Sequence, residues 1–306
     1  MEINFRKTYY HDGKIKYIPI SKIDDLKMFE QFSNLNTIKT GDNVKKLRFL
    51  AASDFHIGNS DYRPDSLANA FNYCVINGIH IIMCSGDLLD GTFTAGNQII
   101  NDPYEQMRFF IENYPHDESI LTFAVGGDHD LSLLKNYGID VKTFINNIRN
   151  DVIIPDYNSS IIRIKNDSVL LYHHIDGCKY KKYNSSLILH GHSHEFKVIN
   201  FKSDKFIEVC VPSLSDIISP IPIVLDVNLD FLNGHISNIN IKQIMLANKP
   251  VKLGEYVYKL SEKPKEKNKN SEVSQEKIIV AENSIMEQNN VTSIEQNDEK
   301  AKILTL

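Results

Sequence analysis

The sequence predicts an α/β domain built on two β-sheets. Between Leu47 and Leu246, short apolar runs of strand length alternate with segments of helical periodicity, which is the pattern of an α/β domain. In the first half of this region helices separate the strands, whereas in the second half strands follow one another as hairpins. This change of connection favours two sheets over one.

The first half contains three predicted strands and two predicted helices. The strands are the apolar runs Arg48–Ala52, Ile79–Cys84 and Ile120–Val125. The first helix spans Pro64–Asn77, where apolar side chains recur at helical spacing, and the second spans Tyr104–Glu112. The second half supplies further strand-like runs at 161–164, 169–172, 187–190, 206–211, 222–227 and 235–244.

The ends of the chain differ from this central region. We expect residues 1–46 to form an N-terminal extension packed on the main domain, with a helix near Lys22–Phe32, and residues 47–258 to form that domain. Residues 259–306 are expected to be a disordered polar tail, because beyond Glu262 there is no aromatic residue, glycine or histidine. Its few apolar residues make the tail a candidate for binding a protein partner.

Composition excludes several classes of protein. Of the 306 residues 42% are hydrophobic, which suffices for a sizeable core, and no apolar run approaches the roughly 20 residues of a membrane-spanning helix. The chain has 34 basic and 39 acidic residues, and this charge balance disfavours a protein that coats polyanions in general. The four cysteines include no Cys-x-x-Cys pair, and the first residues lack a signal peptide, so we expect a cytoplasmic protein without disulfides or membrane contact.

Carboxylates and imidazoles gather at the ends of five predicted strands. The five blocks are Asp54-Phe55-His56, Gly86-Asp87-Leu88-Leu89-Asp90, Gly127-Asp128-His129-Asp130, His173-His174 and Gly191-His192-Ser193-His194. Strand ends are where α/β sheets place their functional sites. In extended chain, residues two apart point to the same side, so Asp54 with His56, and His192 with His194, can each line one cavity.

Imidazole and carboxylate without thiolate suit Mn, Fe, Zn or Ni better than a structural zinc finger. The glycines that open three of the blocks allow sharp turns beside an ion. So many carboxylates at close range repel one another, and a pair of divalent cations would remove that repulsion.

The five blocks, in this order, resemble the motifs of the calcineurin-like metallophosphoesterase superfamily. The resemblance covers roughly residues 47–246 and implies a two-sheet β-sandwich flanked by helices in four layers. The first two blocks are most similar to the DNA-repair nuclease branch. The implied activity is hydrolysis of phosphate esters, with phosphodiesters favoured, by in-line attack of a water that bridges two metal ions.

The resemblance also implies roles for individual residues. One metal would be held by Asp54, His56, Asp87 and His194. The second would be held by Asp87, Asp128, His173 and His192, with Asp87 shared between the two. His129 would face the substrate and protonate the leaving oxygen, with Asp90 orienting its ring.

Asp128 is a departure from the family pattern, which has asparagine at this position. The carboxylate keeps an oxygen for the metal but loses an amide donor and adds negative charge near an anionic substrate. It puts catalytic efficiency in question and favours an oxygen-preferring ion, so Mn²⁺ is the expected metal, with Fe, Zn and Ni as alternatives.

Substrate choice stays open at this point. Arg63, Lys179 and Lys181 are candidates for binding a phosphate group, and the substrate could be a nucleotide or a nucleic acid. A phosphomonoesterase is one alternative. Another is a non-catalytic binding or scaffold protein on the same fold, which Asp128 favours and the presence of all the other predicted ligands opposes.

Overall fold

The structure is a computed structural model that describes residues 5–9, 15–19, 37–38, 40–41, 43–92, 97–174, 185–200, 206–215, 221–246 and 249–260. The predicted helix at Lys22–Phe32 and the predicted tail from residue 261 onward lie outside the described residues. None of the described helices has the length and apolar character needed to span a membrane.

A seven-stranded mixed sheet forms the centre of the fold. Its strands lie in the order β15 (Val251–Lys259), β14 (His235–Met245), β13 (Ile223–Leu232), β4 (Lys46–Ala52), β5 (Ile81–Cys84), β6 (Leu121–Ala124) and β7 (Val152–Ile153). The strands β4 to β7 are parallel to one another, and the remaining neighbours pair antiparallel. The parallel strands are the ones that are connected along the sequence by helices.

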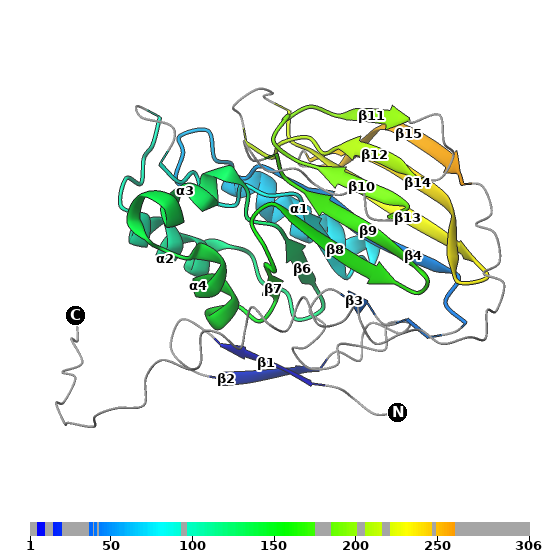
Figure 1. Ribbon diagram of the computed structural model, residues 1–306, viewed down its shortest axis with the longest axis horizontal. Helices are drawn as coiled ribbons and strands as arrows, with labels where there is room; N and C mark the ends of the chain where they lie inside the picture. The colour runs from blue at the N-terminus through cyan, green and yellow to red at the C-terminus, as the bar shows by residue number, and fades with distance from the viewer. Residues whose placement is uncertain are drawn as a thin grey trace, which may run out of the picture. The chain divides into compact units, whose positions relative to one another are not determined.

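A six-stranded sheet packs against the first (Figure 1). Its order is β11 (Lys197–Asn200), β12 (Ile207–Cys210), β10 (Leu187–His190), β9 (Asp167–Tyr172), β8 (Ser159–Ile164) and β3 (Thr37–Ile38). The central strands β9, β10 and β12 run parallel, so β9 and β10 end at the same edge of the sheet. A separate hairpin pairs β1 (Phe5–Tyr9) with β2 (Ile15–Pro19).

The alternating direction of side chains along each strand divides the apolar residues between two cores, one on each face of the seven-stranded sheet. Because successive side chains of a strand point to opposite faces, Phe49 and Ala51 of β4 face the six-stranded sheet while Leu50 and Ala52 face the helices. All four side chains are almost completely buried. The resulting continuous apolar runs are typical of parallel strands covered on both faces.

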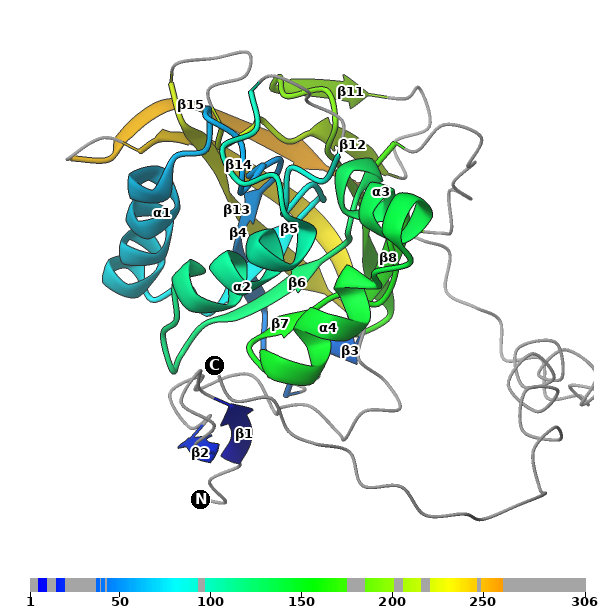
Figure 2. The ribbon, with the colours of Figure 1, turned by 90° about the vertical axis from the view of Figure 1, so that its left-hand side faces the viewer.

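Four helices cover the other face of the seven-stranded sheet (Figure 2). They are α1 (Pro64–Asn77), α2 (Pro103–Asn113), α3 (Asp128–Tyr137) and α4 (Val141–Ile148). The described residues therefore form three layers, helices, sheet and sheet, and no helix described by the structure lies on the outer face of the six-stranded sheet. The predicted α/β fold with two packed sheets and flanking helices is confirmed, and of the four layers expected the described residues form three.

Candidate metal centre

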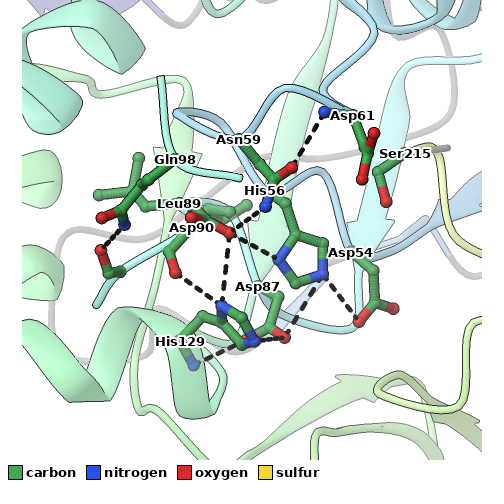
Figure 3. Close-up of polar contacts among 12 residues, drawn as sticks. Asp54, His56, Asn59, Asp61, Asp87, Leu89, Asp90, Gln98, His129 and Ser215 are labelled. Carbon is green, nitrogen blue, oxygen red and sulfur yellow. Dashed lines mark hydrogen bonds and ion pairs between the residues drawn. The ribbon is translucent and has the colours of Figure 1, made fainter. Parts of the chain in front are cut away.

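The site lies where strands of both sheets end. Asp54 and His56 follow β4, Asp87 follows β5, and Asp128 opens α3 directly after β6. From the other sheet, His173 follows β9, and His192 and His194 follow β10. Figure 3 shows Asp54, His56, Asp87 and His129 pointing toward one another. All seven predicted ligands have a side-chain atom in one of two neighbouring groups.

The first group joins Asp87, Asp128, His173 and His192, each with one donor atom within 4.8 Å of the others. Asp128 Oδ1 lies 2.9 Å from His173 Nε2 and 3.2 Å from His192 Nδ1. His173 Nδ1 lies 2.7 Å from the carbonyl oxygen of Ser85, which can only accept, so Nδ1 carries the hydrogen. His173 Nε2 therefore faces the two carboxylates, in the orientation that a metal ligand needs.

The second group joins Asp54, His56 and His194. His194 Nε2 lies 3.2 Å from Asp54 Oδ1 and 3.3 Å from His56 Nε2. Two ring nitrogens that face each other at this distance share at most one proton, whereas a cation between them could be bound by both. Asp54 is completely buried and His56 is 1% exposed, so water cannot easily solvate either group.

Asp87 lies between the two groups. Its Oδ2 is 3.2 Å from His173 Nε2 in the first group and 3.8 Å from His56 Nε2 in the second. Its Oδ1 accepts from the backbone N–H of His129, but the buried Oδ2 has no hydrogen bond. A buried carboxylate oxygen without a hydrogen bond is costly, and one shared by two cations would not be.

Gly127 makes room for the Asp87 carboxylate. A Cβ at this position would lie 2.2 Å from Asp87 Oδ1, and the backbone φ of 114° is one that other residues rarely adopt. Glycine is therefore required for α3 to begin directly beside the shared carboxylate.

The pKa values of the two most buried histidines of the site, His173 and His56, are shifted in opposite directions. Burial by itself lowers the pKa of His173, but the charge of Asp87 and the hydrogen bond to Asp128 outweigh it and raise that pKa well above the ordinary value. Burial lowers the pKa of His56 to about 4, despite the opposing charge of Asp87. A cation bound through His173 Nε2 would displace a proton, whereas His56 is already neutral.

Both outer carboxylates are held in the charged form. Burial alone would raise the pKa of Asp54, but the hydrogen bond to His194 and neighbouring imidazoles lower it. The pKa of Asp128 is lowered in the same way, against burial, by hydrogen bonds with His173 and His192. Carboxylates that stay ionised and imidazoles that can be neutral form a donor set that fits divalent cations.

The backbone at the site is left-handed rather than extended. Five of the seven predicted ligands have positive φ angles: Asp54 (56°), His56 (50°), Asp87 (54°), His192 (73°) and His194 (58°). The expectation that residues two apart converge because the chain is extended was therefore wrong. Positive φ is uncommon for residues other than glycine, and such strain clusters at functional sites, where the surrounding structure over-determines it.

His129 lies beside the first two groups, in the first turn of α3. Its Nε2 is 4.0 Å from Asp87 Oδ2, and His56, Asp87 and His129 also form a group within metal-binding distance. Its Nδ1 lies 2.6 Å from the backbone oxygen of Asp90 but 3.8 Å from the Asp90 carboxylate (Figure 3). Asp90 thus contacts the ring through its peptide carbonyl, and its carboxylate accepts instead from Asn59 Nδ2 at 2.9 Å.

Asp130 holds the loop that carries Asp87. Its completely buried carboxylate accepts from the backbone N–H groups of Leu88 and Leu89, at 2.9 and 3.1 Å. Burial and the charge of Asp87 raise the pKa of Asp130 well above its ordinary value, against the effect of these hydrogen bonds. The third block therefore braces the second beyond the ends of the paired strands β5 and β6.

The remaining predicted residues either belong to neither of the two groups or lie outside the described residues. Arg63 is the N-cap residue of α1 and is partly buried, and it is a member of neither group. Lys179 and Lys181 lie outside the described residues. His174 is exposed, with Nδ1 3.2 Å from the hydroxyl of Tyr172 and its ring 5.4 Å from that of His192.

Two supporting residues were not identified from the sequence. Asn59 binds the Asp90 carboxylate, and the hydroxyl of Ser213 donates to the Asp54 carbonyl at 2.8 Å. Asn59 lies only three positions after His56, so its place next to the first block was the available signal. Ser213 is far from every block in sequence, and only the pairing of the two sheets brings it to Asp54.

Several solved structures are similar to this chain. An archaeal phosphodiesterase is 15% identical over 65% of this chain and 100% of its own, with a TM-score of 0.41. The phosphoesterase YfcE from E. coli is 13% identical over 69% of this chain and 98% of its own, with a TM-score of 0.42. GAP50, the anchor in the inner membrane complex of Plasmodium, is 13% identical over 72% and 91%, with a TM-score of 0.43.

No family model matches this sequence, and no curated protein matches it. Because all three TM-scores lie below 0.5, the function of the site has to be argued from the side chains of this chain.

Proposed function

We propose that this protein is a dinuclear metal-dependent hydrolase of phosphate esters, with phosphodiesters as the favoured substrates. The observation that supports this most strongly is the Asp87 carboxylate, whose buried, unbonded Oδ2 lies between two groups of ionised carboxylates and imidazoles. A shared ligand position explains both its burial and the approach of His56 and His173 to the same oxygen.

The proposed ligand sets follow the two groups. Asp54, His56, Asp87 and His194 would hold one ion, and Asp87, Asp128, His173 and His192 the other. When bound, two such cations activate a water for attack and neutralise the charge of the phosphate oxygens. Mn²⁺ is the proposed metal because the carboxylate of Asp128 adds an oxygen-donating charge to the thiolate-free set of imidazoles and carboxylates, which favours an oxygen-preferring ion.

His129, in its doubly protonated form, is proposed to donate the Nε2 proton to the leaving oxygen, which leaves the neutral Nδ1–H tautomer. Its Nδ1 is held by the Asp90 carbonyl, so Nε2 is the nitrogen that faces the site, 4.0 Å from Asp87 Oδ2. The side chain is 15% exposed, whereas that of Asp87 is 1% exposed, so His129 is the more accessible of the two to a substrate. A general acid in this position typically contributes about 10²- to 10⁴-fold to the rate.

Asp128 favours the second candidate function, a non-catalytic binding protein on the same fold. Its carboxylate adds a negative charge at a site that would receive an anionic phosphate. Against this candidate, Asp128 Oδ1 contacts both His173 and His192, so the oxygen is placed for a metal as the amide oxygen of an asparagine would be. A phosphomonoesterase and a cytoplasmic location also stay predictions from the sequence.

The deciding experiment is a paired assay on wild type and His129→Ala, with bis(4-nitrophenyl) phosphate and 4-nitrophenyl phosphate as substrates and added Mn²⁺. We expect wild type to hydrolyse the diester faster than the monoester. His129→Ala should keep its bound Mn²⁺ and lose about 10²-fold or more in kcat.

Metal analysis of the same samples separates the alternatives. Faster turnover of the monoester would favour a phosphomonoesterase. Bound metal without turnover of either ester would favour the binding protein, and a wild-type protein with neither metal nor turnover would overturn the proposed metal centre as well.

A further inference from the structure

The peptide link between Asp90 and Gly91 has a side-chain partner on each side. Its carbonyl oxygen lies 2.6 Å from His129 Nδ1, and its N–H donates to Gln106 Oε1 at 3.0 Å. Both groups belong to one planar amide, so a shift at either end moves the other. Gln106, on the first turns of α2, is thereby connected to His129 on α3 through a single peptide unit.

The side chain of Gln106 is completely buried, and both polar atoms of its amide take part in hydrogen bonds. While Oε1 accepts from Gly91, Nε2 donates to the carbonyl oxygens of Gly91 at 3.0 Å and Ile100 at 2.8 Å. Exchanging the amide oxygen and nitrogen would place NH₂ against an N–H and an oxygen against two carbonyls. The orientation of Gln106 is therefore determined by its partners.

Close packing leaves this arrangement little freedom. A Cβ on Gly91, where φ is +66°, would lie 2.1 Å from the backbone oxygen of His129. A Cβ on Gly58 would lie 3.0 Å from Cδ of Gln106. The loops after β4 and β5 and the beginnings of α2 and α3 meet at this one buried amide.

This arrangement determines which nitrogen of His129 faces the site. A carbonyl oxygen only accepts hydrogen bonds, so the contact with Asp90 requires the proton on Nδ1. Nε2 is then the nitrogen directed toward Asp87. The Asp90 carboxylate lies 3.8 Å from Nδ1, beyond hydrogen-bond distance, so the hydrogen bond to Nδ1 is the one with the Asp90 carbonyl.

We propose that Gln106 is a positioning residue for His129. By holding the Asp90–Gly91 peptide, it keeps the imidazole in the Nδ1–H tautomer with Nε2 toward the candidate metal centre. The kinetic consequence rests on the proposed function, but the tautomer of His129 can be measured without any turnover.

The first test is the tautomer itself, measured by long-range ¹H–¹⁵N correlation spectra of the full chain labelled with ¹⁵N-histidine, without metal and in alkaline buffer. The His129 signals are identified by their loss in His129→Ala. We expect wild type to show the Nδ1–H tautomer and Gln106→Met to show a mixture of tautomers. An Nε2–H tautomer in wild type would overturn the proposal, even if Gln106→Met failed to fold.

Gln98→Met is the matched control. The amide of Gln98 also donates to the carbonyl oxygen of Gly91, but this oxygen belongs to the peptide that follows Gly91 and not to the Asp90–Gly91 peptide. This variant should therefore keep the wild-type His129 tautomer. A change equal to that of Gln106→Met would show that general loosening of the loop is responsible, and would contradict the proposal.

The second test is kinetic. Gln106→Met should lower kcat by about tenfold, with the larger loss for a phenyl ester than for a 4-nitrophenyl ester, because the poorer leaving group depends more strongly on protonation. In a His129→Ala background the same substitution should have no further effect, whereas additive losses would contradict the proposal. If wild type has no turnover, the proposed function fails, and the tautomer measurement alone decides the role of Gln106.

Discussion

Individual residues of the site are held in conformations that they would not adopt alone. Asp87 combines a positive φ, complete burial and a carboxylate oxygen without a hydrogen bond. Each of these features costs free energy in the folded protein, and together they are the expected signature of a residue selected for binding rather than for stability.

Replacing the shared carboxylate should therefore disturb both metal positions. Asp87→Asn keeps the shape of the side chain but removes its charge, and we expect Mn²⁺ binding to fall from about two ions per chain to fewer than one. Asp54→Asn, which alters only one group, should leave about one ion. Elemental analysis after dialysis against Mn²⁺ measures both numbers.

Asp65→Asn is the control for this prediction, because Asp65 is an exposed carboxylate in the first turn of α1, outside both groups. It should bind as much Mn²⁺ as wild type. Equal losses in Asp54→Asn and Asp87→Asn would contradict a shared position for Asp87.

At the level of elements, apolar patterning predicted most of the core. Helix α1 has the predicted bounds, Pro64–Asn77, and the predicted strand 187–190 is β10. Helix α3 was missed because its first turn, Asp128-His129-Asp130, has the polar composition of a loop. Strand β15 was missed because most of its side chains are exposed, so its sequence lacks the alternation of a half-buried strand.

A buried ion pair joins strands β4 and β13 to helix α1. Asp226 is completely buried and accepts from Arg48 Nε at 2.8 Å, from Arg48 Nη2 at 2.6 Å and from the hydroxyl of Tyr73 at 2.9 Å. Arg48→Met would leave the Asp226 charge buried with one strong partner. We expect the free energy of unfolding to fall by about 2 to 3 kcal/mol. This loss is smaller than is usual when a buried ion pair is broken, because the Arg48 side chain is 30% exposed.

Urea denaturation of Arg48→Met beside Lys46→Met measures this difference. Lys46 is on the same strand, but its ion pair with Asp230 is at the surface, with the lysine side chain 77% exposed. Removing that pair should change stability by less than about 0.5 kcal/mol. Similar losses in both variants would show that the buried pair has no special role.

On the scale of the whole molecule, the candidate metal centre joins the two sheets. Asp54, His56 and Asp87 come from the seven-stranded sheet, whereas His173, His192 and His194 come from the six-stranded sheet. An ion held by both sides can bind only when the sheets are packed together. Metal binding should therefore stabilise the folded protein as a unit.

Mn²⁺ at about 100 times its Kd should add about 2.7 kcal/mol of stability, which corresponds to a rise in Tm of about 5 to 10 °C for a domain of this size. Thermal unfolding with Mn²⁺ and with a chelator measures the difference. Asp87→Asn should show little of this rise, and an equal rise in that variant would mean that the ions bind elsewhere.

The sequence by itself determined the α/β class, the two sheets and the five strand ends where the acidic and imidazole side chains gather. These features depend on local apolar patterning and on short spacings, which are visible along the chain. The packing of the sheets decided the rest. Left-handed backbone at Asp54 and His192, the use of the Asp90 carbonyl and the buried amide of Gln106 all depend on contacts between residues distant in sequence, which no local pattern encodes.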